Sequence, residues 1–163
     1  MRHVHRVLPA LVFLGACPAG DPCAGTEGVA PSLVLGEGPD GFQRALEVGY
    51  TLRAEFGPQG GYHVWPAVRT TGFAPGTPGR GLGSDRNAPT FTASLFEELI
   101  PIESVETTLA MEGDGAAAEL VLFRLPLAID LGDERPFRLE VTGSDVCGTT
   151  VSAAQEVLIG LER

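Results

Sequence analysis

The sequence predicts an all-β protein built as a single antiparallel β-sandwich of about eight strands. Apolar and polar residues alternate with a period of two in segments that recur about every ten residues. Turn residues separate these segments, with 22 Gly and 13 Pro in 163 residues. No segment shows a convincing helical period, and there is neither an internal repeat nor a second domain.

The first residues have a different pattern from the rest of the chain. Arg2 and Arg6 precede an apolar stretch, residues 7–14, that is too short to span a bilayer, and small residues and Cys17 follow it. This is the layout of a secretory signal peptide. The segment "LGAC" resembles the bacterial lipobox, which implies cleavage before Cys17, a lipid on its sulfur and anchoring in a membrane. The alternative is an ordinary signal peptide in which a Cys happens to follow Ala16.

Three regions follow from these patterns: a signal peptide over residues 1–16, a lipidated tether over 17–31 and a β-sandwich domain over 32–163. The tether, "CPAGDPCAGTEGVAP", is rich in Gly, Pro and Ala and has no apolar period. In familiar lipoproteins of Gram-negative bacteria, Asp after the lipidated Cys favours the inner membrane. Pro18 stands there instead, so the resemblance implies an exported protein in the outer membrane of the cell envelope.

Alternation defines each strand of the sandwich in turn. Residues 50–56 place Leu52 and Phe56 on one face and Arg53 and Glu55 on the other, and "GPQGG" then turns the chain into a partner strand. The architecture expected is immunoglobulin-like or fibronectin-III-like, without the Cys–Trp–Cys spacing of true immunoglobulin domains. The predicted strands are residues 32–38, 50–56, 62–72, 90–97, 104–112, 116–127, 137–143 and 149–161.

The same alternation identifies core residues in the later strands. It places Leu109 and Met111 inward in one strand and Phe137, Leu139 and Val141 inward in another. Residues 116–123, "AAAELVLF", also fit one helical turn by propensity, but their β-rich neighbours favour a strand.

The number of cysteines predicts one disulfide. If Cys17 carries lipid, Cys23 and Cys147 remain as a pair in an oxidising compartment. A Cys23–Cys147 bond would join the tether to a strand near the end of the chain. The alternatives are two separate thiols or a bond to another molecule.

Charge and composition exclude several functions. The formal net charge of −10 and the lack of a basic patch argue against nucleic-acid binding. The chain has three His, no "GxSxG" motif and too few His for a zinc hydrolase, so no enzyme, cofactor or metal centre is expected. The acidic loops 112–115 and 130–134 do not fit the EF-hand pattern and are expected to be solvated turns.

The stretch "GPQGGYHVWPAVR" offers the one candidate ligand or partner contact, His63, Trp65 and Arg69. Alternation places these three residues on one face and Tyr62, Val64, Pro66 and Val68 on the other. The Val-bearing face is the expected core face, although a strand carrying its Trp inward would invert this assignment. The first face would then bind metal, carbohydrate or a protein. The alternative is a packed Trp65 and a His63 hydrogen-bonded within the turn. Pro66 indicates an edge strand or a bulge.

The segment "FGPQGGYHVWPAVRTTGF", with "GEGPDGFQ" before it, resembles a segment of uncharacterised lipoproteins of myxobacteria and their relatives. The resemblance covers about residues 32–75 and implies compartment and fold but no activity. Together these observations predict a lipid-anchored envelope protein with a structural, adhesive or protein-interaction role, whose partner is a protein or glycan of the envelope. A small-ligand module that binds metal or carbohydrate near His63 and Trp65 is the alternative.

Overall fold

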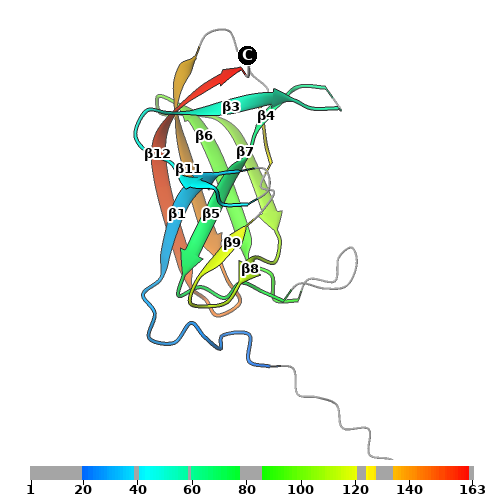
Figure 1. Cartoon of the computed structure of the whole chain (residues 1–163), viewed down its shortest axis with the longest axis vertical. Coiled ribbons are helices and arrows are strands. Elements are labelled where there is room, and N and C mark those ends of the chain that lie inside the picture. Colours follow the sequence, from blue (N-terminus) through cyan, green and yellow to red (C-terminus); the bar gives the residue numbers. More distant parts are fainter. Residues whose placement is uncertain are drawn as a thin grey trace, which may run out of the picture.

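The computed structural model describes residues 20–38, 41–58, 60–77, 86–120, 124–127 and 134–161, and these form an all-β molecule without a helix (Figure 1). Two sheets face each other across one core. The arrangement confirms the predicted all-β class and its two layers, which alternation, strand spacing and turn residues indicated.

The smaller sheet has five strands in the order β2-β1-β5-β9-β8, and all its pairs are antiparallel. Figure 1 shows it lying across the larger sheet. Its strands are β1 (Ser32–Glu37), β2 (Arg44–Ala45), β5 (Pro66–Thr71), β8 (Glu112–Gly113) and β9 (Ala118–Leu120).

The larger sheet has seven strands in the order β10-β4-β3-β12-β11-β6-β7. One pair, β3 with β12, is parallel, and the others are antiparallel. The sheet is therefore mostly rather than wholly antiparallel. Its strands are β3 (Tyr50–Phe56), β4 (Tyr62–Val64), β6 (Thr90–Glu97), β7 (Ile100–Thr108), β10 (Leu125–Leu127), β11 (Arg135–Ser144) and β12 (Thr150–Leu161).

The expected count of about eight strands is wrong, since the described residues form twelve. Three predicted strands each reach from one sheet to the other. Residues 62–72 divide at Trp65 into β4 and β5, and residues 116–127 divide into β9 and β10. Residues 104–112 hold the second half of β7 and the first residue of β8. Alternation reports which side of a strand is buried, and it does not report which sheet buries it. With this count and a parallel pair, the fold is not clearly immunoglobulin-like.

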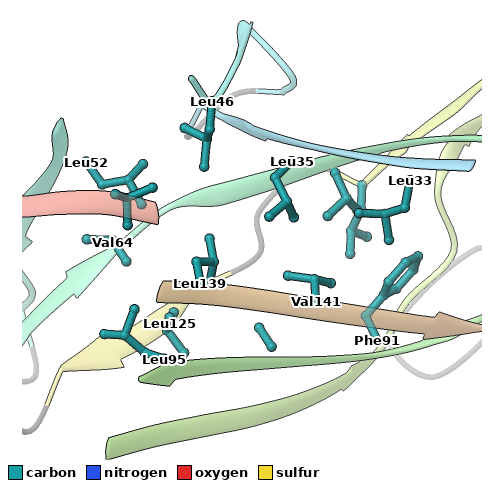
Figure 2. Close-up of a cluster of buried hydrophobic side chains, with 14 of the residues drawn as sticks. Leu33, Leu35, Leu46, Leu52, Val64, Phe91, Leu95, Leu125, Leu139 and Val141 are labelled. Carbon is teal, nitrogen blue, oxygen red and sulfur yellow. The ribbon is translucent and has the colours of Figure 1, made fainter. Parts of the chain in front are cut away.

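The core lies between the two sheets. Figure 2 shows Leu33 and Leu35 of β1 pointing towards Leu139 and Val141 of β11. Phe137, Leu139 and Val141 are at most 1 % exposed, as alternation predicted, and Met111 is buried as well. Two expectations are wrong: Phe56 is 68 % exposed and Leu109 36 % exposed, because each lies where its strand has reached a turn. Figure 2 also labels Leu46, Leu52, Val64, Phe91, Leu95 and Leu125.

Two aromatic rings lie so close to Gly143 that a side chain does not fit at this position. A Cβ added at Gly143 of β11 would lie 2.6 Å from Cε1 of Phe91 and 3.3 Å from Cζ of Phe73. The two rings pack against each other with their centroids 5.6 Å apart. Gly143 therefore leaves the room that these rings occupy.

The predicted disulfide is present. Cys23 and Cys147 are bonded with their Cα atoms 5.9 Å apart, and the bond joins the segment before β1 to the β11–β12 turn. Asp145 organises the same turn: its carboxylate accepts hydrogen bonds from the backbone N–H groups of Cys147 (2.9 Å), Thr149 (2.8 Å) and Ala74 (2.8 Å). The turn is thus held to both the leading segment and the loop after β5.

Neither acidic loop forms a metal site in the part of the chain that is described. Asp114 Oδ1 accepts the backbone N–H of Ala116 at 2.9 Å and of Ala117 at 3.2 Å, which closes a turn between β8 and β9. Residues 130–133 of the second loop lie outside the described residues. Nowhere in the described ranges do three or more His, Cys, Asp or Glu side chains gather as a metal would require.

Candidate functional site

The stretch from Gly57 to Trp65 forms the hairpin between β3 and β4. Its turn is closed by hydrogen bonds from Gly57 N to Gly61 O (2.9 Å) and from Gly60 N to Gly57 O (3.0 Å). Gly60 and Gly61 both have φ of +82°, a conformation that side chains disfavour. The glycines of this stretch are therefore explained by the turn itself.

His63 is buried rather than presented on a surface. It lies on β4 between β3 and β10, opposite Glu55 and Pro126, and is 4 % exposed. Val64 beside it is 0 % exposed, so both faces of β4 are covered. The face that carries Val64 is buried as expected, and the face that carries His63 is buried as well, because Trp65 and Gly57 pack against the imidazole.

Trp65 packs on His63 and bonds to β3. The two rings meet edge to face, with centroids 4.9 Å apart and planes at 88°. The indole Nε1–H donates to Glu55 Oε2 at 3.0 Å, and the side chain is half-buried. The sequence did not decide between a packed and an exposed Trp65. In the structure its ring contacts His63, and part of the side chain stays accessible to solvent.

Arg124 and Gly57 complete the site. A Cβ added at Gly57 would lie 2.9 Å from Arg124 Nη2 and 3.0 Å from both Nδ1 and Cε1 of His63. The guanidinium and the imidazole thus pack directly against Gly57 and leave no room for a side chain there. His63 Nδ1 and Arg124 Nε are both buried, and neither has a hydrogen-bond partner within the described residues. We call Gly57, His63 and Arg124 the Gly57 cradle.

The electrostatics of the cradle keep His63 neutral. Burial lowers the pKa of His63 below its ordinary value, and the nearby positive charge of Arg124 lowers this pKa further. Glu55 acts in the opposite direction but does not reverse the shift. At neutral pH, His63 therefore offers one nitrogen as an acceptor and one as a donor.

Arg69 lies apart from this cluster. It belongs to β5 in the smaller sheet, where it donates to Glu119 from Nε (2.8 Å) and Nη2 (2.6 Å). Its guanidinium stacks over the Phe42 ring, 4.2 Å from the centroid. The predicted grouping of His63, Trp65 and Arg69 on one face is wrong, because the strand changes sheet at Trp65.

Two charged members of the site were not identified from the sequence. Glu55 was placed on the polar face of its strand, and nothing in the sequence paired it with Trp65. The sequence does set Arg124 apart, because it is the one charged residue in the apolar run "LVLFRLPL". A charge inside such a run indicates either a surface-facing position or a buried functional group.

Another concave region lies near the β6–β7 turn, a cavity of about 370 Å³ lined in part by Glu97, Arg135 and Arg138. Its charges pair with acids: Arg135 with Glu97 at 3.2 Å and Arg138 with Glu140 at 2.8 Å. None of the three candidate contact residues, His63, Trp65 and Arg69, lines it. We therefore take the Gly57 cradle with Glu55 and Trp65 as the candidate site.

The predicted lipidation site, Cys17, lies outside the described residues. Within the described ranges, no helix has the length and apolar character needed to cross a membrane. No protein family model matches the chain, and no curated protein matches its sequence.

Proposed function

We propose that this protein is a lipid-anchored component of the bacterial cell envelope with a structural, adhesive or protein-interaction role, and that it has no catalytic one. The Cys23–Cys147 disulfide carries the proposal. Such bonds persist in oxidising compartments, which agrees with an exported chain. The bond also leaves Cys17 as the one remaining cysteine of the chain, available for the lipid that the "LGAC" segment implies.

The position of the disulfide orients the proposed anchor. Cys17 precedes Cys23 by six residues, so a lipid on Cys17 would hold the β11–β12 end near the membrane. β11 has ten residues, and at about 3.3 Å per residue its other end lies about 30 Å away. The β6–β7 turn is at that far end, because Phe96 pairs with Arg138 whereas Thr90 pairs with Ser144.

Exposed apolar side chains at the far end support an interaction role. Leu99 is 85 % exposed and Ile100 66 % exposed at the β6–β7 turn, and Phe56 is exposed at the β3–β4 hairpin. Contiguous apolar groups in water are typical of surfaces that contact a partner, and Leu99 and Ile100 are adjacent in the chain. The partner proposed is a protein or glycan of the envelope that lies beyond the anchored end.

Fractionation of cells tests the anchor. Cys17→Ala should move the protein from the membrane fraction to the soluble fraction and should abolish incorporation of labelled palmitate. Cys23→Ala is the matched control, since it alters a cysteine of the same segment that takes no lipid. A Cys17→Ala protein that stays with the membranes would show that the anchor is not there.

Cross-linking in living cells tests the interaction role. A photoreactive amino acid at Ile100, at the far end, should give discrete cross-linked envelope products. The same amino acid at Val146, which is 50 % exposed in the β11–β12 turn, is the control. Equal products at both positions, or none at Ile100, would contradict a partner at the far end.

A small-ligand module around His63 and Trp65 is the second candidate function, with metal or carbohydrate as the ligand classes. The observation that favours it is the pair of buried nitrogens without partners, His63 Nδ1 and Arg124 Nε. Because Trp65 is the one Trp of the chain, its fluorescence should change saturably when the right metal or glycan is added. Unchanged fluorescence across such titrations would refute this candidate.

A further inference from the structure

We propose that the cavity beside the β6–β7 turn receives a Lys or Arg side chain of a partner protein, and that Leu99 and Ile100 contact the apolar residues next to that side chain. The inference rests on the proposed interaction role at the far end of the sandwich and deepens it. Of the two partner classes named there, it selects a protein, and it states what the contacting surface of this protein presents: a cationic side chain among apolar ones.

The cavity is large enough for a long side chain. Its volume is about 370 Å³, and ligand pockets typically have about 300–1,000 Å³. It lies on the side of β11 that turns away from the core, where Pro136 and Arg138 alternate with the buried Phe137 and Leu139. The turn between β6 and β7 forms one wall, since Glu98 lines the cavity as well.

The cavity holds more negative than positive charge. Its two arginines each pair with one carboxylate, at 3.2 Å and 2.8 Å. Glu98 and Glu156 also line it, and neither forms an ion pair within the part of the chain that the structure describes. Arg138 is opposite Glu156 in the β11–β12 register, but its guanidinium bonds to Glu140 on its own strand. Two carboxylates thus remain for a cation from outside.

The tip of the β6–β7 turn carries residues that such a turn disfavours. Glu97 pairs with Ile100, so Glu98 and Leu99 are the two residues of the tip. Glu98 has φ of +56°, a conformation in which two-residue hairpin turns favour Gly, Asn or Asp. Leu99 is 85 % exposed. Neither residue helps the turn to form, and backbone strain of this kind is typical of functional sites.

A β-bulge next to the tip directs apolar side chains outward. The register of β6 with β7 shifts between Leu95 and Phe96, which leaves one extra residue, Ile102, on β7. Ile102 packs against the core, whereas Ile100 is 66 % exposed. Leu99 and Ile100 therefore form an exposed apolar pair that continues the chain from Glu98 at the cavity.

Charge and apolar contact together favour a protein as the partner. A neutral glycan brings no cation to Glu98 and Glu156, and an acidic glycan is repelled by them and by the net charge of −10. Lys and Arg side chains carry their charge at the end of an apolar stem. Such a side chain can lay its stem along Pro136 while its charge meets the two carboxylates.

The test is an NMR titration of the full-length protein with the peptide acetyl-Leu-Arg-Leu-amide. The control peptide, acetyl-Leu-Gln-Leu-amide, keeps the apolar groups and lacks the cation. We expect saturable shifts of the Leu99 methyl and Glu98 amide signals with the Arg peptide, and about threefold or more weaker binding of the Gln peptide. Val146 in the β11–β12 turn should show no shift. Added salt should weaken binding of the Arg peptide alone.

Two substitutions locate the cation. Glu98→Gln and Glu156→Gln should each weaken binding of the Arg peptide about threefold, and the double variant about tenfold. Glu27→Gln/Glu112→Gln is the matched control, because it makes the same change of net charge at exposed acids outside the cavity, and it should leave binding unchanged. The amide spectrum of each variant establishes that it is folded.

Glu98→Gly separates a binding role from a structural one. Glycine adopts a positive φ without strain, so this variant should melt no lower than the wild-type protein and yet bind the Arg peptide more weakly. A lower melting temperature with unchanged binding would show that Glu98 serves the turn alone, and would overturn the inference.

Cross-linking in cells distinguishes this inference from the proposed function. A photoreactive amino acid at Ile100 should give fewer products when Glu98→Gln and Glu156→Gln are combined. Products that are unchanged in this double variant would overturn the cationic contact and leave the interaction role standing. Equal binding of the two peptides, or Arg-peptide binding that survives the double variant, would overturn the contact as well. No products in the wild-type protein would remove the interaction role, and this inference with it.

Discussion

Removal of the Cys23–Cys147 disulfide is the perturbation whose size follows most directly from the structure. The two cysteines are 124 residues apart, and for a closed loop of this length the chain-entropy model gives about 5 kcal/mol. Part of this is offset, because most of the described residues before β1, 20–31, are exposed and gain freedom in the reduced native protein. We therefore expect Cys23→Ser/Cys147→Ser to lower the free energy of unfolding by about 3–5 kcal/mol.

Urea unfolding followed by Trp65 fluorescence measures this loss. With an m-value of about 2 kcal/mol/M, the midpoint should fall by about 2 M. Cys17→Ser is the matched control and should not move the midpoint, since Cys17 takes no part in the bond. A loss below about 1 kcal/mol in the double variant would refute the reasoning, because it would mean that closing this loop hardly restricts the unfolded chain.

Three further predictions concern the core, the β11–β12 turn and the buried histidine. Gly143→Ala should destabilise the fold by about 1–3 kcal/mol through contact with Phe91, whereas Gly20→Ala, which has open space around it, should not; thermal melts compare them. Asp145→Ala removes the acceptor of three backbone N–H groups and should lower the unfolding free energy by about 3 kcal/mol, and Asp145→Asn, which keeps Oδ1, should lower it less. Because burial and Arg124 lower the pKa of His63 in the folded state, the unfolded state binds the proton more readily. Stability should therefore fall as the pH drops below about 6.5, the ordinary pKa of histidine, and His63→Gln should flatten this dependence in urea titrations; a slope unchanged by His63→Gln would contradict it.

The predictable parts of the fold are the strands that stay in one sheet and bury one face. Phe137, Leu139 and Val141 alternate along β11, and a strand with one face on the core must show that pattern. The disulfide was predictable from the number of cysteines rather than from geometry, since only Cys23 and Cys147 remain once Cys17 is set aside.

The rest could not be predicted because it depends on contacts between distant segments. Alternation continues through Trp65, and nothing local marks the passage from β4 to β5 except Pro66, which begins β5 and donates no backbone hydrogen bond. The candidate site has the same difficulty. Glu55, His63 and Arg124 come from three strands or their ends, and their meeting depends on the pairing of β4 with both β3 and β10.

Trp65 links the site to the architecture. Its carbonyl accepts the N–H of Gly38 at 3.3 Å, just after β1 in the smaller sheet, while its indole bonds to Glu55 in the larger sheet and its ring packs on His63. Substitutions on either side of His63 should therefore both lower stability. Trp65→Phe removes the Glu55 bond, and Gly57→Ala brings a Cβ to 3.0 Å from the His63 ring and 2.9 Å from Arg124 Nη2, closer than such contacts normally come. Thermal melts measure both losses. A Gly57→Ala protein that melted at the wild-type temperature would contradict the packing of His63 and Arg124 against residue 57.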